Sequence, residues 1–336
     1  MIYENVSVDA VKGMIIGHAV GDALGVPVEF TSREERMAHP VTEMLGYMEY
    51  NVPAGSWSDD TSMTLCLMKS ISIWCRLNYK DIMDNFIAWM DKGEMTSTGT
   101  MFDIGRATMQ ALMKYHNGTE PLQCGGGSEY DNGNGSLMRI APIAPYMYAF
   151  SGTNPSNEDM DSIHDVSALT HSHPRSQMAC GIYTYIAVHL LAGKDLREAI
   201  KAGLAAAQAY YAGKERFQAE LATYSRLWDI DSFAKLPVDA IRSSGYVVDT
   251  LEAAIWCLLN TKSYEQCVIG AVNLGEDTDT TGAVAGGLAG LAYGYEAIPA
   301  RWLDKLQKRE ELEHACEEFQ QGLEGALLYK CFRGLD

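Results

Sequence analysis

Two short acidic clusters, far apart in the chain, constrain how it can fold. The first runs from Ser56 to Thr61 and the second from Gly275 to Thr280. Each combines two aspartates with at least one hydroxyl side chain, and each precedes a stretch with helical periodicity. One such cluster usually caps a helix, whereas two of matching chemistry indicate the two halves of one site for a hard divalent cation. The fold must then bring these two distant clusters together.

Helical periodicity dominates the rest of the sequence, and strand-like alternation is scarce. Gly, Pro and Asn punctuate the gaps, as at residues 117–134 and 151–157. The predicted class is therefore all-α, with many short helices around one core. The predicted helices span residues 8–24, 62–77, 79–90, 104–115, 177–191, 196–211, 250–259, 263–274 and 280–293.

The sequence predicts a single domain over residues 1–336. It contains no repeat of fixed period and no linker-like stretch. Any plausible domain boundary would also separate the two acidic clusters, which are expected to form one site. The segment from about 212 to 237 is the most polar and least regular, and it is predicted to be a variable surface segment.

Composition excludes some partners. The formal charge of −18 argues against a nucleic-acid backbone as the main partner, because phosphate binding needs clustered Lys and Arg. The 8 cysteines form no CxxC pair, which favours buried thiols in a reducing compartment. Residues 1–12 show no signal-peptide pattern, and no apolar run reaches the roughly 18 residues needed to span a bilayer. We expect a cytoplasmic protein with no membrane partner, and nothing in the sequence requires more than a monomer.

In the first cluster, Ser58, Asp59 and Asp60 are adjacent. On a helix their side chains would point about 100° apart, so they can face one ion only where the backbone turns, and Gly55 allows such a turn. The start of the following helix favours carboxylates through its free N–H groups and its dipole. Simple capping, with Asp59 or Asp60 as the N-cap, is the alternative.

The second cluster has the same logic. Asp277 and Asp279 are two apart, which suits a loop whose alternate side chains converge, and Thr280 can cap the helix or offer a hydroxyl to a metal. The helix that follows, residues 281–290, is rich in glycine, each of which costs up to about 1 kcal/mol. Such a helix makes sense where neighbouring helices approach closely, so we expect it in the centre of the domain beneath the site.

Four aspartates held together need cations. At about 4 Å and an effective dielectric constant near 20, each like-charge pair costs roughly 4 kcal/mol. Hard oxygen ligands select Mg²⁺, Mn²⁺ or Ca²⁺ rather than zinc. Two ions a few ångströms apart would balance the charge.

Three other motifs carry candidate chemistry. A helix is predicted to end near Gly25, stopped by Pro27, and Glu29 then projects from a tight turn; the alternative is that Glu29 is an ordinary surface carboxylate. The stretch Gly133, Asn134, Gly135, Ser136 has glycines that leave N–H groups free to cradle phosphates before a helix, although such loops are often plain turns. The histidines of residues 170–174 more often cap a helix than bind a metal.

Taken together and in this order, the motifs resemble the ADP-ribosylglycohydrolase family. The resemblance spans about residues 11–293 and rests on residues 21–25 with Glu29, 58–61, 133–139, 170–173 and 275–282. It implies an all-α single-domain fold and a centre of two Mg²⁺ or Mn²⁺ ions. The implied metal ligands are Ser58, Asp59, Asp60, Asp277, Asp279 and Thr280.

The resemblance also implies roles for residues near the metals. Glu29 matches a glutamate beside the metals that contacts the ribose or a water. Ser58 stands where relatives more often have threonine; the hydroxyl is kept, with a slightly looser site. Tyr246 matches an aromatic position near adenine, where a flat ring would stack on the base, with core packing as the alternative.

Residues 97–105 are similar to the branch of the family that contains dinitrogenase reductase-activating glycohydrolase. In that branch the aspartate matching Asp103 lies near the scissile bond, and the substrate is ADP-ribose linked to arginine. A carboxylate facing a guanidinium is physically sensible. The alternative is that Asp103 only caps the next helix.

The function implied is metal-dependent hydrolysis of the N-glycosidic bond between ADP-ribose and a modified protein side chain, with arginine favoured. The catalytic candidates are Asp103 and Glu29, and the substrate-binding candidates are Gly133, Asn134, Gly135, Ser136 and Tyr246. The partners are then ADP-ribose and an ADP-ribosylated protein. Alternatives are a hydrolase of serine-linked or O-acetyl ADP-ribose and a non-catalytic ADP-ribose-binding relative.

Overall fold

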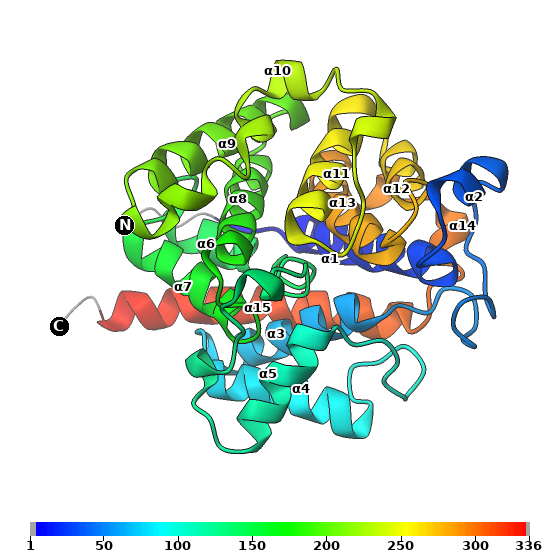
Figure 1. Cartoon of the computed structure of the whole chain (residues 1–336). Coiled ribbons are helices and arrows are strands. Elements are labelled where there is room, and N and C mark those ends of the chain that lie inside the picture. Colours follow the sequence, from blue (N-terminus) through cyan, green and yellow to red (C-terminus); the bar gives the residue numbers. More distant parts are fainter. Residues whose placement is uncertain (1–4, 334–336) are drawn as a thin grey trace.

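Two glycine-rich helices pack along each other through the middle of the molecule (Figure 1). They are α1 (Val8–Gly25) and α13 (Thr278–Tyr293). A Cβ atom added at Gly21 would fall well inside van der Waals contact of the Gly282 carbonyl oxygen, and the same holds for Gly290 against Gly13. Every residue of α13 from Thr278 to Gly290 is buried. The prediction of a central small-residue helix is confirmed, because only glycine permits this approach.

The computed structural model describes residues 5–333, with side chains to residue 328. In the view of Figure 1, helices α6 to α9 lie on one side of the central pair, α11 and α12 on the other, and α3, α4, α5 and α15 below. The remaining α-helices are α2 (Arg33–Ala38), α3 (Asp59–Trp74), α4 (Tyr79–Lys92), α5 (Arg106–His116), α6 (Ile143–Ser151), α7 (Asn157–Ala168), α8 (Pro174–Leu191), α9 (Leu196–Ala212), α10 (Ile230–Phe233), α11 (Val247–Asn260), α12 (Tyr264–Val272), α14 (Ala300–Leu303) and α15 (Arg309–Arg333). Short 3-10 helices are η1 (Val26–Val28), η2 (Pro121–Gln123), η3 (Glu129–Asp131), η4 (Glu215–Glu220), η5 (Ser225–Trp228), η6 (Val238–Ala240) and η7 (Tyr295–Ala297).

The all-α prediction is confirmed. Between residues 5 and 333 the chain forms no β-strand. It has only isolated β-bridges, between Gly126 and His171 and between Gly133 and Tyr246. Each predicted helix is present with ends shifted by a few residues. The prediction missed several helices, of which α6, α7 and α15 are the longest.

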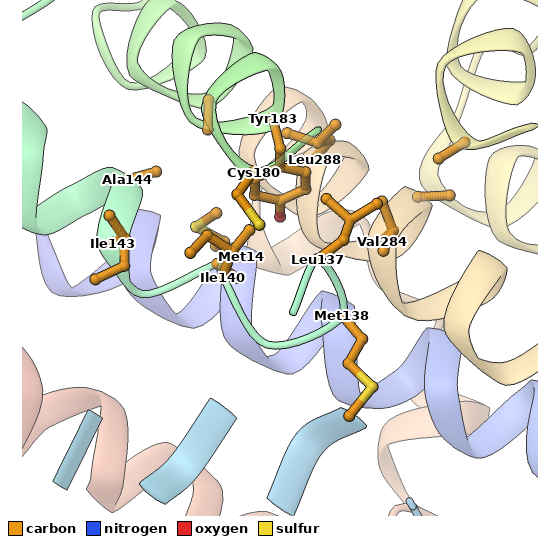
Figure 2. Close-up of a cluster of buried hydrophobic side chains, with 14 of the residues drawn as sticks. Met14, Leu137, Met138, Ile140, Ile143, Ala144, Cys180, Tyr183, Val284 and Leu288 are labelled. Carbon is orange, nitrogen blue, oxygen red and sulfur yellow. The ribbon is translucent and has the colours of Figure 1, made fainter. Parts of the chain in front are cut away.

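The hydrophobic core is one cluster that draws on most helices. Figure 2 shows a part of it in which Ile140, from the turn after the glycine-rich stretch, lies beside Met14 of α1 and Cys180 of α8. Leu137 of the same turn lies beside Val284 and Leu288 of α13. This turn is thereby anchored from below, while its glycines face the other way, into a cavity described in the next section.

The polar segment 212–237 forms η4, η5 and α10 on the outside of α8 and α9. Its aromatic side chains Phe217, Tyr224 and Phe233 are buried, so the segment is held firmly to the body of the molecule. Its variability among relatives stays a prediction.

Two further sequence expectations concern cysteines and membranes. The cysteines at the positions described by the structure are all unpaired, and all are buried except Cys75, which is half-buried. The helices of residues 5–333 include none with the length and apolar content required to cross a bilayer.

Candidate active site

The first acidic cluster forms the start of α3. Ser58 is the N-cap residue, and its hydroxyl accepts the N–H of Asp60 at 3.3 Å. The alternative that Asp59 or Asp60 is the N-cap is therefore wrong, because both lie in the first helical turn. Asp22, near the end of α1, accepts the N–H groups of Ser58 at 2.9 Å and Thr61 at 3.1 Å. This buried carboxylate ties the start of α3 to α1 and leaves the side chains of Asp59 and Asp60 free for other partners.

The second cluster forms the start of α13. Asp277 is the N-cap residue but makes no side-chain capping bond, and Asp279 lies in the first turn. The hydroxyl of Thr280 donates to Asp60 Oδ1 at 3.3 Å and so joins the two clusters directly. Helices α1 and α13 are in close contact. The side-chain carboxyl groups of the two clusters are therefore brought together.

Five carboxylates form two overlapping groups. The carboxyl oxygens of Asp22, Asp60 and Asp279 lie within 4.8 Å of one another, and so do those of Glu29, Asp103 and Asp279. Asp279 belongs to both groups, so it stands between them. Asp59, Asp277 and Thr280 line the cavity beside these groups.

Burial and mutual repulsion dominate the electrostatics of the site. Burial raises the pKa of Asp59, Asp60 and Asp279 well above the ordinary value, and the neighbouring carboxylates raise it further. Burial, then the charges of Asp103 and Asp277, raise the pKa of Glu29 to about 9. Every shift in the cluster has the same direction, so removal of protons without a counter-charge is unfavourable throughout.

The donor set fits divalent cations. The ion pairs found among the described residues all use other carboxylates, so these acids have no Lys, Arg or His partner there. Asp60 Oδ2 and Asp277 Oδ1 are buried and have no hydrogen-bond donor. Buried carboxylate oxygens without a donor are costly, and a hard cation satisfies them. The residues present could therefore hold metal ions.

Asp103 and Glu29 reach the cluster from separate loops. Asp103 has a φ of 58°, an uncommon left-handed conformation, and lies in the cavity wall. The alternative that it caps the next helix is wrong, since α5 begins at Arg106 with Gly105 as N-cap and no side-chain cap. Glu29 is buried rather than a surface carboxylate, and its Oε2 accepts the hydroxyl of Tyr50 at 2.8 Å.

A cavity of about 350 Å³ opens beside the acidic cluster. The predicted substrate-binding residues Gly133, Asn134 and Gly135 line it, whereas Ser136 is fully buried beneath them. The loop leads into a turn rather than a helix, which corrects the sequence prediction, because α6 begins only at Ile143.

The loop is fixed from two sides. The Asn134 side chain donates to Asp277 Oδ2 at 3.0 Å, and its backbone N–H donates to the Gly245 carbonyl at 3.0 Å. From below, the buried guanidinium of Arg139 donates to the carbonyl groups of Gly135 and Val166. Among the described residues, the N–H groups of Gly133 and Gly135 have no protein acceptor, so they are available to a ligand.

The sequence pattern did not assign His171 and Thr108 to the site. Both are buried and line the cavity beside Gly135, and the Thr108 hydroxyl has no hydrogen-bond partner. Nδ1 of His171 lies 2.7 Å from the hydroxyl of Thr170. Burial lowers the pKa of His171 to about 3, so the ring is neutral. In the tautomer whose Nδ1 accepts the hydroxyl of Thr170, Nε2 carries the hydrogen and can donate. The predicted capping role holds for His173, the N-cap of α8.

Tyr246 lies at the start of α11, next to the cavity wall. Its neighbour Gly245 lines the cavity, and Gly133 pairs with Tyr246 in a β-bridge. The ring is half-buried, with the guanidinium of Arg175 5.7 Å from its centroid. Its contact with adenine stays a prediction.

Known proteins resemble this chain over nearly all of its length. The sequence model of the family described as ADP-ribosylglycohydrolase matches residues 4–327. The chain is 33% identical over 325 residues to "ADP-ribosylarginine hydrolase Tri1" of Serratia proteamaculans, covering 95% of this chain and 81% of that protein. It is 31% identical over 309 residues to "ADP-ribosyl-[dinitrogen reductase] glycohydrolase" of Rhodospirillum rubrum, covering 91% and 92%. A solved structure titled "ADP-ribosylglycohydrolase-related protein complex" matches with a TM-score of 0.73 and 30% identity, covering 94% of this chain and 98% of that one.

Proposed function

The chain belongs to the ADP-ribosylglycohydrolase family, and we propose that it hydrolyses the N-glycosidic bond between ADP-ribose and an arginine side chain of a modified protein. The linkage is proposed because relatives that match over most of their length are named for arginine or for dinitrogen reductase. The observation that carries the proposal is the pair of three-carboxylate groups that share Asp279 beside a cavity of about 350 Å³.

We infer that the site holds two divalent cations, Mg²⁺ or Mn²⁺. Ser58, Asp59 and Asp60 would supply ligands from the start of α3. Asp277, Asp279 and Thr280 would supply them from the start of α13. Asp60 and Asp279 belong to the carboxylate groups described above, Asp59, Asp277 and Thr280 line the cavity beside them, and an all-oxygen donor set favours these ions over zinc. When bound, such ions orient sugar hydroxyls and lower the pKa of water toward neutrality.

The protein's own residues divide the remaining tasks. Asp103, whose pKa burial and then Asp277 raise to about 6, is ionised at neutral pH and can accept a proton from the attacking water. Glu29 is held in place by its hydrogen bond with Tyr50. It belongs to the same three-carboxylate group as Asp103 and Asp279, where it can orient the ribose or the attacking water. The guanidine leaves readily only when it stays protonated, and an acidic wall favours the cationic form.

The glycine-rich loop would hold the pyrophosphate. The unused N–H groups of Gly133 and Gly135, the hydroxyl of Thr108 and Nε2–H of His171 converge on one part of the cavity wall. Such neutral donors bind phosphate oxygens without the clustered Lys and Arg that this acidic chain lacks. The adenine would then extend toward Tyr246, where an aromatic ring can stack on the base.

The test is release of ADP-ribose from matched peptides modified on arginine or on serine, read by mass spectrometry. Each reaction is run with Mg²⁺, with Mn²⁺ and with EDTA. We expect release from the arginine peptide only when a metal is present. Release from the serine peptide alone would contradict the linkage, no release from either would indicate a binding protein, and full activity in EDTA would contradict the metal centre.

We propose that the protein acts as a cytoplasmic monomer. The acidic surface and the unpaired cysteines support a soluble protein in a reducing compartment. Size-exclusion chromatography with light scattering checks this, and a mass of about 37 kDa is expected from the 36.9 kDa chain.

A further inference from the structure

Large apolar side chains are exposed to water at the cavity and on a loop that packs beside it. Phe30 and Tyr130, which both line the cavity, are 67% and 86% exposed. Tyr47 and Met48, on the loop after α2, are 68% and 53% exposed. We call these four side chains the apolar rim. Single exposed apolar residues need no explanation, but a group of them beside a binding cavity marks an interaction surface.

Three contacts place the loop that carries Tyr47 and Met48 at the cavity. The backbone N–H of Glu49 donates to the Pro27 carbonyl at 3.2 Å. Tyr50 donates to the cavity residue Glu29, and its ring lies 5.2 Å from that of Phe102, the neighbour of Asp103. The two residues that follow Met48 therefore rest on the residues that frame the catalytic carboxylates.

Two aromatic residues of the rim are held in an unfavourable backbone conformation. Phe30 has a φ of 62° and Tyr47 a φ of 57°, in the left-handed region that bulky residues rarely adopt. Phe30 is fixed there by a pair of 2.7 Å hydrogen bonds, from its N–H to the Glu276 carbonyl and from the Glu276 N–H to the Thr31 carbonyl. Tyr47 is fixed by a 2.8 Å bond from its N–H to the Val52 carbonyl.

Core packing does not account for this strain. The side chains that the strained positions present are mostly in water, so the folded protein gains little from burying them. Backbone strain that persists at the edge of a functional site is commonly part of its function. The two strained positions therefore hold aromatic rings in water, that of Phe30 at the cavity itself.

We propose that the apolar rim binds the polypeptide on either side of the modified arginine, and that it favours substrates with apolar residues at these flanking positions. The inference rests on the proposed function. When ADP-ribose fills the cavity, the linked side chain must leave through the mouth, so its flanking residues meet the rim. Free ADP-ribosyl-arginine has no flanking residues and gains nothing from it.

The experiment compares three substrates with the metal-loaded enzyme. Two peptides carry the same central ADP-ribosyl-arginine, one flanked by leucine and phenylalanine and the other by glycine and serine, and the third substrate is free ADP-ribosyl-arginine. The double variant Tyr47→Asn, Met48→Ser removes both side chains, and asparagine tolerates a positive φ better than other residues with a side chain. Ile73→Ser, at a 62% exposed position near the far end of α3, is the matched control.

We expect the wild-type enzyme to have a kcat/KM about tenfold higher for the apolar-flanked peptide than for the polar one. The double variant should lose this preference, mainly through KM, while kcat/KM for free ADP-ribosyl-arginine stays within twofold. Ile73→Ser should retain the preference. Thermal melting of each variant verifies that it is folded.

Other outcomes overturn the inference in distinguishable ways. A wild-type enzyme that cleaves both peptides equally well removes the preference itself. An unchanged preference in the double variant removes the rim as its cause. Dimerisation of the wild-type protein that the double variant abolishes, without any peptide preference, assigns the rim to a second copy of the chain. If no substrate releases ADP-ribose, the proposed function fails and this inference with it.

Discussion

At the scale of single residues, Asp103 and Glu29 face the same neighbour, Asp279, yet their pKa values differ in the metal-free site. The pKa of Asp103 is raised to about 6 and that of Glu29 to about 9. Glu29 also accepts the hydroxyl of Tyr50, whereas Asp103 stands on a strained loop at the cavity. The lower pKa of Asp103 in the metal-free site makes it the better candidate for the general base.

Asp103→Asn should therefore damage turnover more than binding. General acid–base groups contribute about 10²- to 10⁴-fold, so a fall in kcat of that size is expected. The Kd for ADP-ribose, measured by calorimetry, should change by less than about fivefold, since asparagine keeps the size and polarity of the side chain. Parallel losses in binding and turnover would show that Asp103 positions the ligand instead.

Glu252, away from the site, gives a pH-dependent prediction. It is buried on α11 beside Arg226, and burial raises its pKa to about 7 despite that partner. The folded protein therefore binds a proton that the unfolded chain releases near 4.5, so stability attributable to this group falls as pH rises from 4.5 through 7.

The variant Glu252→Gln mimics the protonated group at every pH. Its free energy of unfolding should match that of the wild type near pH 4.5 and exceed it at pH 8, by up to about 3 kcal/mol. Urea unfolding at both pH values measures the difference. A variant that is less stable at pH 8 would mean that the Arg226 pair outweighs burial.

The sequence identified the acidic residues but not what supports them. Ser58 to Asp60 and Asp277 to Thr280 carry a local signal, which is carboxylates at a helix start. Asp22 lies inside a helix, and its partner Ser58 is 36 positions away. Thr108 and His171 likewise become neighbours only through the packing around Gly135. These long-range contacts leave no periodicity in a single sequence.

At the scale of elements, the contact between α1 and α13 sets the position of both acidic clusters. Gly21→Ala would place a methyl group against the backbone of Gly282 and force the two helices apart. Such overpacking costs about 1–3 kcal/mol and should also weaken metal binding, because the carboxylates sit at the ends of these helices.

Gly270→Ala provides the control, since it is the same substitution within helix α12. Its nearest neighbour would be Cys257 Sγ at 3.8 Å, an ordinary contact. This variant should be more stable than the wild type by about 0.5–1 kcal/mol. Thermal melting of both variants measures whether each substitution lowers or raises the stability of the protein. If Gly21→Ala stabilised the protein, helices α1 and α13 would have space for a methyl group between them, which would contradict this prediction.

Helices with a clear apolar face were predictable from the sequence. Two of the helices that the prediction missed, α15 and α7, have few buried apolar residues or are mostly polar. In its described part, helix α15 buries about one side chain per turn, between many acidic residues. These side chains are Leu312, Cys316, Phe319, Leu323 and Ala326. Helix α7 is mostly polar and is started by the capping box of Ser156 and Asp159. The glycine-rich loop was predicted to precede a helix, but the guanidinium of Arg139 bonds back to it and holds a turn.

At the scale of the whole molecule, the acidic site couples metal binding to folding. Seven buried or nearly buried carboxyl groups, each with a raised pKa, oppose the folded state until a counter-charge arrives. Each bound Mg²⁺ or Mn²⁺ at about a hundred times its Kd should add about 2.7 kcal/mol to the free energy of unfolding, so the two proposed ions together should add about 5.4 kcal/mol.

Differential scanning calorimetry with Mn²⁺, with Mg²⁺ and with EDTA measures this gain without any substrate. Asp279→Asn, which neutralises the residue shared by both carboxylate groups, should abolish the gain and the hydrolase activity while leaving the metal-free protein at least as stable. Retention of the full metal-induced shift in this variant would contradict the assignment of Asp279 as a ligand.

The hydrogen bond between Thr280 and Asp60 joins positions 220 apart in the chain. During translation the early half of the acidic site emerges from the ribosome long before its counterpart, at about 5–20 residues per second. A nascent chain that ends before Asp279 lacks the carboxylate that both groups share. If the site binds cations as proposed, complete binding requires a chain synthesised past Asp279, and a shorter polypeptide lacks a shared ligand of the site.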